Sequence, residues 1–316
     1  MSAPTLGWLA LAWLMRHLPS PRDETRPYLP ADWQARRTLR WYELGPSGRR
    51  LWNRCHDEDP KGIGKSPHAA ATCICEFRGP VVFDGWARAG DVYACVRNAC
   101  RCGWERPYEP GEAKGRPWGS PGLPSPWVQV AAVSEAQTAN TWAALHAFLA
   151  ANDGRLADWL GLDPGRTLVY WRDRMDAKIE RVTSSSASRT GQPITHALID
   201  EPQEQTPELR GPMLAETILQ NLTKLDGWAH FTGNAPVLGR GSVAELLAGA
   251  APRALHMAPR PSVAPREDMT RDELRPLVAE VYQGTPWAQV ERILDDIEAR
   301  AAHPWPTVLR LFLNVP

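Results

Sequence analysis

The run DPKGIGKS at residues 59–66 combines the residue types and spacing of a loop that binds a polyphosphate. Its two glycines remove the Cβ atoms that would hold backbone N–H groups away from an anion. The small and apolar residues 67–77 are predicted to form a helix whose N-terminus faces the phosphates. Lys65 would then reach the β- and γ-phosphates, and the Ser66 hydroxyl would hold Mg²⁺. Asp59 stands where the pattern G-x-x-x-x-G-K-S/T has its first glycine, so the run is a variant.

A second run, ITHALIDE at residues 194–201, is apolar and closes in two carboxylates. This pattern is typical of a buried strand that delivers acids to its C-terminal end, although a core strand entering an acidic turn would look the same. In the first case Asp200 supports Mg²⁺, and Glu201 orients and polarises the attacking water. The two runs together, in this order along the chain, favour an enzyme that hydrolyses a nucleoside triphosphate.

Three further positions are candidates for contacts to the nucleotide. Gln34 lies on a helix predicted from Ala31 to Leu44, and its amide can pair with adenine as both donor and acceptor; the alternative is a surface position. Thr232 and Asn234 end a predicted strand that lies next in the sheet to the acidic one, where they would sense the γ-phosphate or simply turn the chain. The predicted nucleotide-contacting residues are therefore Gln34, Lys61, Gly62, Ile63, Gly64, Lys65, Ser66, Pro67, Thr232 and Asn234.

Arg189 belongs to a polar loop, residues 184–191, that would approach the same edge of the sheet. It is a candidate to stabilise charge on the transferred phosphoryl group or to contact DNA. A solvated loop arginine is the alternative interpretation.

Three of the six cysteines, Cys95, Cys100 and Cys102, lie within eight residues of one another. They would hold Zn²⁺ if Cys55, His56 or another group supplied a fourth ligand. Their spacing matches no standard zinc ribbon or finger, and free buried thiols are the alternative. Nothing else in the sequence suggests secretion, so reduced thiols in a cytoplasm are expected.

Composition limits the class of protein. The 316 residues, 43% hydrophobic and 23% charged, suit one large α/β domain with appendages, or two domains. The 36 basic and 36 acidic residues balance, so contact with nucleic acid would require a local basic patch. The apolar segment at residues 6–15 is too short to span a bilayer and lacks the flanks of a signal peptide, so we predict an N-terminal helix.

Strands alternate with helices along most of the chain, which predicts a mainly parallel sheet covered on both faces. The predicted strands lie near residues 51–58, 127–133, 167–171, 178–183, 194–200, 227–236 and 254–257. Residues 79–126 form an insertion rich in glycine, proline, tryptophan and arginine that is too long for a simple connection.

The C-terminal part changes character after a proline-rich linker at residues 259–266. Helices are predicted over 270–282 and 286–301, the second capped by Thr285. One face of the second helix is apolar and must pack on the rest of the chain or on a neighbouring subunit.

Taken together, these blocks resemble the large terminase subunit of tailed bacteriophages, particularly the type found in phages and prophages of actinobacteria. The resemblance spans about residues 30–250, and the SEAQTANT block is its most specific part because generic P-loop enzymes do not need it. It is carried by the blocks PKGIGKSPHAA, RGPVVFDGW, WVQVAAVSEAQTANTW, SSSASRTG, THALIDEP and WAHFTGNAPVLGRGSVAE.

The resemblance implies an additional-strand P-loop ATPase (RecA- or ASCE-like) that uses Mg²⁺ and ATP to translocate double-stranded DNA into a procapsid. It further implies a ring, usually a pentamer, on the portal protein, loaded by a small terminase subunit in the cytoplasm of the infected host. The chain would then form a ring when assembled and be a monomer in isolation. Lys65 and Ser66 resemble Walker A, Asp200 and Glu201 resemble Walker B, and Arg189 resembles an arginine that precedes Walker B.

The expected organisation is a P-loop ATPase domain at residues 1–258 and a helical linker subdomain at 259–316. Relatives continue into an RNase-H-like nuclease, but no spare cluster of carboxylates follows residue 260, so nuclease activity is not expected in this chain. Two alternatives remain at this point. One is another P-loop nucleic-acid translocase or helicase, and the other is a non-catalytic assembly module that retains the fold.

Overall fold

The structure is a computed structural model that describes residues 3–184, 191–247, 252–299 and 303–316. Its centre is an eight-stranded sheet in the order β14-β3-β13-β12-β8-β11-β10-β9. The strands from β14 to β11 run parallel, and β10 and β9 add antiparallel at one edge. The strands are β3 (Arg54–Glu58), β8 (Trp127–Ala131), β9 (Leu162–Pro164), β10 (Leu168–Trp171), β11 (Arg174–Val182), β12 (His196–Asp200), β13 (Trp228–Gly233) and β14 (Ala254–Met257). The predicted mainly parallel α/β sheet is confirmed.

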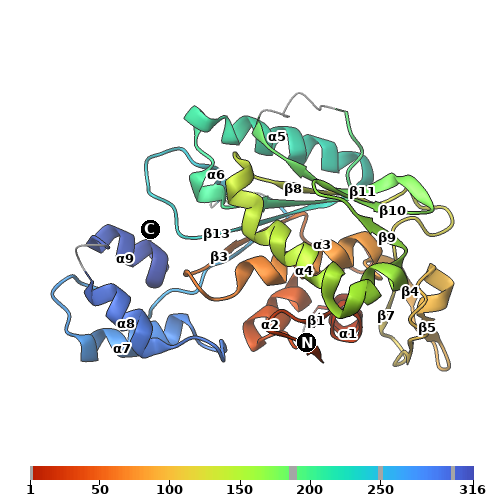
Figure 1. Ribbon diagram of the computed structural model, residues 1–316, viewed down its shortest axis with the longest axis horizontal. Coiled ribbons are helices and arrows are strands. Elements are labelled where there is room, and N and C mark those ends of the chain that lie inside the picture. The colour runs from red at the N-terminus through yellow and green to blue at the C-terminus, as the bar shows by residue number, and fades with distance from the viewer. Residues whose placement is uncertain (1–2, 185–190, 248–251, 300–302) are drawn as a thin grey trace.

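Helices cover both faces of this sheet (Figure 1). On one face lie α1 (Gly7–His17), α3 (Lys65–Arg78) and α4 (Glu135–Leu160), which share an apolar core with β8, β11 and Leu198 of β12. On the other face, α5 (Gly211–Leu222) and α6 (Val243–Leu247) pack on the neighbouring β12 residues Ala197 and Ile199. Alternate residues of one strand therefore enter opposite cores, which explains why residues 197–199 in the middle of β12 are all apolar.

Two features of the helices differ from the sequence-based expectation. α4 is interrupted at Ala151–Gly154, where the backbone leaves helical geometry, close to the predicted end at Leu149. The helix predicted to begin at Pro286 begins instead at Val290 and forms α8 (Val290–Glu298). The prediction that Thr285 caps this helix was wrong, because Thr285 closes a turn in which its N–H donates to the Tyr282 carbonyl at 3.1 Å.

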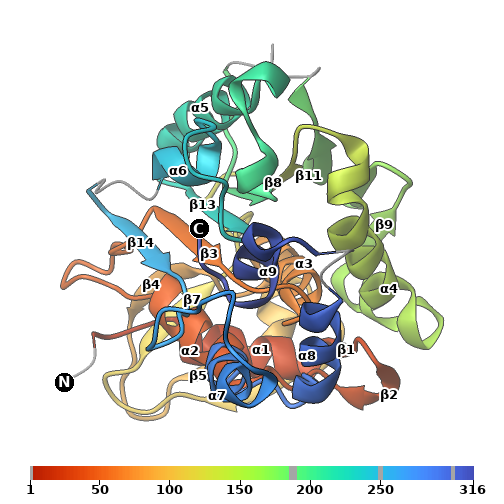
Figure 2. The same cartoon turned by 90° about the vertical axis from the view of Figure 1, so that its left-hand side faces the viewer.

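The C-terminal part forms a small helical group of α7 (Arg271–Val281), α8 and α9 (Trp305–Phe312) at one end of the sheet (Figures 1 and 2). The sequence did not predict α9. The apolar face of α8 packs with α7, α9, Ile63 and Trp33, the last of which belongs to α2 (Asp32–Trp41). This face is therefore covered by the same chain, and the group sits on the loop that precedes α3.

The insertion at residues 79–126 lies at the opposite end of the long axis from α7, α8 and α9 (Figure 1). It contains two small antiparallel pairs, β4 with β7 and β5 with β6. These strands are β4 (Val82–Trp86), β5 (Val92–Ala94), β6 (Glu105–Pro107) and β7 (Ala113–Arg116). Tyr93, Tyr108 and Ala113 are buried in the same core as α1 and α3, so the insertion packs on the main domain. Within the described ranges, no helix has the length and apolar character needed to cross a bilayer.

Candidate functional site

The carboxyl ends of β3, β13 and β12 meet at one edge of the sheet. β13 lies between the other two and pairs with both in parallel, with Thr232 opposite Asp57 on one side and Asp200 on the other. The glycine-rich loop leaves β3 at this edge, and Glu201 follows β12 at the same level. The parallel register alone therefore brings the two sequence motifs together, with one strand between them.

The backbone of the loop shows why its glycines are needed. Gly62 and Gly64 have φ angles of 83° and 96°, in the left-handed region that glycine adopts at little cost. Gly64 immediately precedes α3, and a Cβ on it would lie 2.7 Å from a ring carbon of Trp287. The start of the loop is tied to β13, because the Asn234 side-chain amide donates to the Asp59 carbonyl at 2.6 Å.

Asp59, the departure from the usual P-loop pattern, has a partner in the structure. Its carboxylate is fully buried and receives two hydrogen bonds from the Arg37 guanidinium of α2, one of them at 2.7 Å. Arg37 also lies 3.7 Å from the Asp57 carboxylate, which in turn contacts His230. A buried bidentate pair of this kind fixes the loop to α2 through a side chain that glycine could not supply.

A cavity of about 700 Å³ opens at this edge and is lined by residues of both motifs. The predicted contact residues that line it are Gln34, Lys61, Gly62, Gly64, Lys65, Ser66, Pro67 and Asn234, and Glu201 joins them. Ile63 and Thr232 do not line it. Ile63 points into the apolar core shared with α7 and α8, and Thr232 is buried within β13.

Lys65 is partly buried on the cavity wall, whereas Asp200 is buried and does not itself line the cavity. The Lys65 ammonium donates to the carbonyls of Asp59 and Pro60 at 3.2 and 3.3 Å, and burial lowers its pKa against the attraction of Glu201. Burial, and then the neighbouring Glu201 carboxylate, raises the pKa of Asp200 to about 7, although the Thr141 hydroxyl donates to Asp200 at 2.7 Å. Two adjacent carboxylates, one of them disfavoured as an anion, fit a site for a divalent cation with oxygen ligands.

Glu201 has an unusual backbone that is fixed by its neighbours. Its φ angle is 51°, which costs a residue with a side chain about 1–3 kcal/mol and is typical of functional sites. Its N–H donates to the Thr232 carbonyl at 2.9 Å, and the Gln203 side-chain amide donates to its carboxylate. Gln203 also accepts from the Asn234 N–H at 3.2 Å, so Glu201 and Asn234 are positioned together.

Gln34 connects α2 to the loop. Its side-chain oxygen accepts from the Ala31 N–H at 2.8 Å, and its amide nitrogen lies 3.4 Å from the Gly64 carbonyl. Both ends of the amide have partners, so pairing with adenine requires these contacts to change or to be shared.

The structure adds site residues that the sequence did not single out. Asn140 lines the cavity, and Thr141 contacts Asp200; both come from the SEAQTANT block, which was noted only as a family signature. Arg22 and Trp287 stack at 4.7 Å on the cavity wall, and the Trp287 indole N–H donates to the Gly62 carbonyl at 3.3 Å. No motif connects Trp287 to the loop in sequence.

Two predicted sites remain. Arg189 lies outside the described residues. Cys95, Cys100 and Cys102 come together in the insertion beside His17 of α1. The fourth donor next to the three thiols is His17, which falls under the other groups that the sequence left open, and not Cys55 or His56.

The sheet order, with one strand between the loop-bearing strand and the acidic strand, defines an additional-strand P-loop NTPase fold. No family model matches the chain. The Gene 13 proteins of Mycobacterium phages D29 and L5 are 30% and 29% identical over 267 residues. These matches cover 76% of this chain and 40% of each relative.

Among solved structures, the large terminase of bacteriophage HK97 matches 98% of this chain with a TM-score of 0.65 at 12% sequence identity. The chain covers 55% of that terminase and about two fifths of the mycobacteriophage relatives. The chain therefore has the fold of a phage large terminase, and the resemblance seen in the sequence is confirmed at the level of the fold.

Proposed function

We propose that the chain is the ATPase motor of a phage terminase, hydrolysing Mg²⁺-ATP to translocate double-stranded DNA into a procapsid. The observation that carries this proposal is that Lys65, Ser66 and Glu201 line the same cavity, where the ends of three parallel strands meet. The size of the cavity, about 700 Å³, is in the range of nucleotide and cofactor sites.

The phosphates would lie against the loop and the N-terminus of α3, where backbone N–H groups and the helix dipole favour anions. The Lys65 ammonium, which donates to two loop carbonyls in this structure, would donate to the β- and γ-phosphate oxygens instead when the nucleotide binds. Ser66 and Asp200 would hold Mg²⁺, which neutralises phosphate charge when bound, and its presence would favour the ionised form of Asp200.

Glu201 is the proposed general base. A water that attacks the γ-phosphorus loses its proton to the Glu201 carboxylate while the bond from the γ-phosphorus to the leaving ADP oxygen breaks. Asn234 lies between the loop and the Gln203 side chain that positions Glu201, so it is placed to report the state of the γ-phosphate to β13. We propose Thr232 as part of that same coupling segment and Arg189 as the charge-stabilising group of the preceding loop.

The packaging role rests on the fold shared with the HK97 large terminase and on the two phage relatives. We propose that the portal protein, the small terminase subunit and further copies of this chain are its partners. We also propose that residues 1–258 form the ATPase domain, with 259–316 as a linker subdomain.

The test is ATP turnover with and without double-stranded DNA by the wild-type protein and by Glu201→Gln. Loss of the base is expected to lower turnover by about 10²–10⁴-fold while ATP still binds. Glu208→Gln is the matched control, since Glu208 is exposed, and it should turn over ATP like the parent.

Normal hydrolysis by Glu201→Gln would exclude the assigned base. Absence of ATP turnover in the wild-type protein, with and without DNA, would favour a non-catalytic assembly role. Unwinding of duplex DNA by the protein would favour a helicase over a packaging motor.

A further inference from the structure

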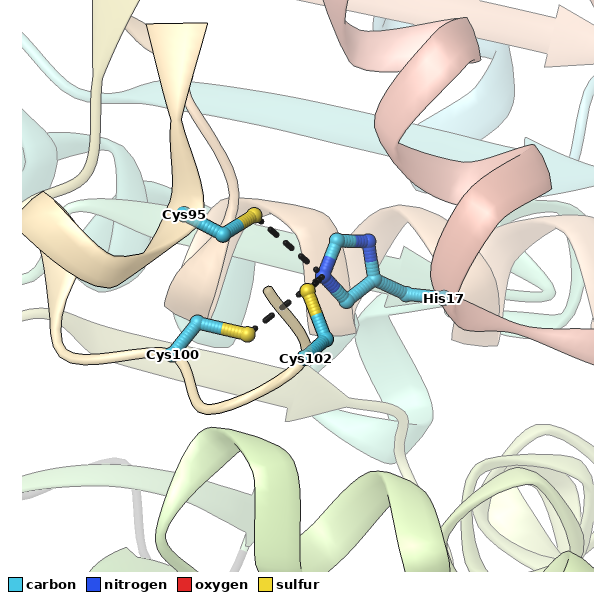
Figure 3. A group of neighbouring side chains, drawn as sticks. All are labelled: His17, Cys95, Cys100 and Cys102. Carbon is cyan, nitrogen blue, oxygen red and sulfur yellow. Dashed lines mark hydrogen bonds between the residues drawn. The ribbon is translucent and has the colours of Figure 1, made fainter. Parts of the chain in front are cut away.

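Four side chains that can bind a metal converge between α1 and the insertion (Figure 3). The Nε2 atom of His17 lies 3.5, 3.5 and 3.2 Å from the sulfurs of Cys95, Cys100 and Cys102, respectively. All four donor atoms lie within 4.8 Å of one another. Three of the side chains are buried and Cys102 is partly buried.

The backbone is folded to bring the three thiols together. A short 3-10 turn at Cys95–Asn98 is followed by Ala99 in the left-handed region, with a φ angle of 55°. The Cys100 N–H then donates to the Cys95 carbonyl at 3.2 Å, which reverses the chain. An alanine in this conformation costs free energy, so the turn is one that the surrounding contacts must stabilise.

Hydrogen bonding alone does not account for this convergence. The Nδ1 atom of His17 lies 2.8 Å from the Trp13 carbonyl, which can only accept, so Nδ1 carries a proton. In the neutral imidazole the proton is then absent from Nε2, which presents a single lone pair. One lone pair can accept from one thiol, yet three sulfurs lie within 3.5 Å of it.

The distances fit one tetrahedral zinc ion. With Zn–S near 2.3 Å and Zn–N near 2.0–2.1 Å, tetrahedral angles place each sulfur about 3.5 Å from the nitrogen. The observed separations are 3.2–3.5 Å. Three thiolates with one imidazole are also a donor set that zinc uses in structural sites.

The surroundings of the four ligands are those of a metal centre. The Nδ1–H bond to Trp13 fixes the tautomer that leaves Nε2 free, as is usual for a ligating histidine. The Trp104 backbone N–H points to the Cys102 sulfur at 3.4 Å, a contact that stabilises a thiolate. The Trp13 ring stacks on the imidazole at 4.2 Å, and Trp104 and Trp159 close its edges, which shields the group from water.

We propose that His17, Cys95, Cys100 and Cys102 bind a structural zinc ion that fastens the insertion to the C-terminal end of α1. Four protein ligands complete a tetrahedral shell, so the ion has no open position for catalysis. The site makes no use of the nucleotide cavity and stands independently of the proposed ATPase function.

A second group of donors, His56, Glu58 and His256, does not share these features. The Glu58 carboxylate already pairs with the Arg260 guanidinium, and the two imidazoles stack on each other at 4.7 Å. A cation there would compete with an arginine, so this group provides a control for selectivity.

The test is the metal content of the protein purified without a polyhistidine tag, measured by inductively coupled plasma mass spectrometry. The wild-type protein is expected to carry about one zinc ion per chain. Cys100→Ala and Cys102→Ala should each lose most of it, whereas Cys73→Ala, a buried cysteine outside the cluster, and His256→Ala should retain it.

Cobalt(II) substitution of the wild-type protein gives a readout that does not depend on how the variants fold. Charge-transfer bands from thiolates, together with intense d–d bands of tetrahedral coordination, support the site, and a weak octahedral spectrum contradicts it. The proposal is overturned if zinc-supplied wild-type protein holds no stoichiometric zinc, or if Cys100→Ala/Cys102→Ala retains it. Iron with acid-labile sulfide, or an intact mass showing a disulfide within the cluster, would overturn it equally.

Discussion

The cavity at the ends of β3, β13 and β12 and the cluster of His17 with three cysteines are assembled by different means. At the cavity, parallel strand register delivers the polar groups to one edge, and the backbone would place them there whatever their side chains. At the cluster, side chains from α1 and from an insertion at the far end of the long axis meet with no shared strand (Figure 1). The first arrangement is a property of the fold, and we propose that a bound zinc ion completes the second.

The two sites also differ in the electrostatic surroundings of their side chains. At the cavity, Lys65 is partly buried on the wall, and the pKa of the buried Asp200 next to Glu201 is raised to about 7 by burial and by the Glu201 carboxylate. A charged ligand that pairs with these groups would stabilise the folded protein, and the site can release that ligand again. At the cluster, Trp13, Trp104 and Trp159 lie against the His17 imidazole, and three of the four donor side chains are buried. The comparison separates the site that we propose to bind and release a nucleotide from the site that we propose to hold a zinc ion permanently.

The largest expected effect in stability comes from the ion pair that holds the loop in place. Arg37→Met leaves the Asp59 carboxylate buried without its partner, and we expect a loss of about 3–5 kcal/mol in the free energy of unfolding. Urea denaturation measures it. Arg36→Met, an exposed arginine on the same helix, should change stability by no more than about 0.5 kcal/mol.

The double variant Arg37→Met/Asp59→Asn should recover part of this loss, because it removes the unpaired charge. Equal losses in the single and double variants would show that packing by Arg37, and not its charge, holds the loop.

Asp200→Asn should stabilise the protein without nucleotide while abolishing Mg²⁺-dependent hydrolysis. Because the folded-state pKa is raised to about 7, the folded protein keeps a proton that the unfolded chain has lost above its usual pKa of 3.8. The free energy of unfolding therefore falls as pH rises through this window. At pH 8 the variant should be more stable than the wild type by about 1–3 kcal/mol, and the difference should vanish near pH 4.

Thermal unfolding at both pH values measures this difference, with Asp163→Asn as an exposed control that should change little. If the variant is less stable than the wild type at pH 8, the protein already stabilises the Asp200 anion without a ligand. That result would contradict the claim that burial and Glu201 disfavour the ionised form of Asp200.

The smallest effect concerns the wall of the cavity. Trp287→Ala removes the stacking with Arg22 and the hydrogen bond to the Gly62 carbonyl. We expect ATP to bind about 5–10-fold more weakly, on the order of 1 kcal/mol, in a fluorescence or calorimetric titration. Trp8→Ala, an exposed tryptophan on α1, should bind like the parent. An unchanged affinity would place Trp287 in the packing of α8 and not in the site.

The sequence predicted the features that follow from the order of strands and helices along the chain. The alternation of strands and helices gave the parallel sheet, and Lys65, Ser66 and Glu201 line one cavity because their motifs end or follow parallel strands. The position of Asn234 beside the loop follows from the same regularity.

The sequence did not reveal contacts that depend on distant side chains. His17 lies 78 residues from Cys95, and no periodicity connects them. From the sequence, Asp59 is a departure from the usual loop pattern. Its role depends on Arg37, which is 22 residues away on α2. The sequence predicts Thr285 as a helix cap because it precedes a proline, but α8 starts only at Val290. Between them, the Trp287 indole N–H donates to the Gly62 carbonyl.

Calorimetric titration of ATP with and without Mg²⁺ tests most directly whether the two motifs serve one nucleotide. The wild-type protein and Cys102→Ala should both bind Mg²⁺-ATP. Lys65→Ala should bind it at least about 10-fold more weakly, and Asp200→Asn should lose the dependence on Mg²⁺. Equal affinities in the wild-type protein and Lys65→Ala, or binding by the wild type that Mg²⁺ does not change, would contradict the account.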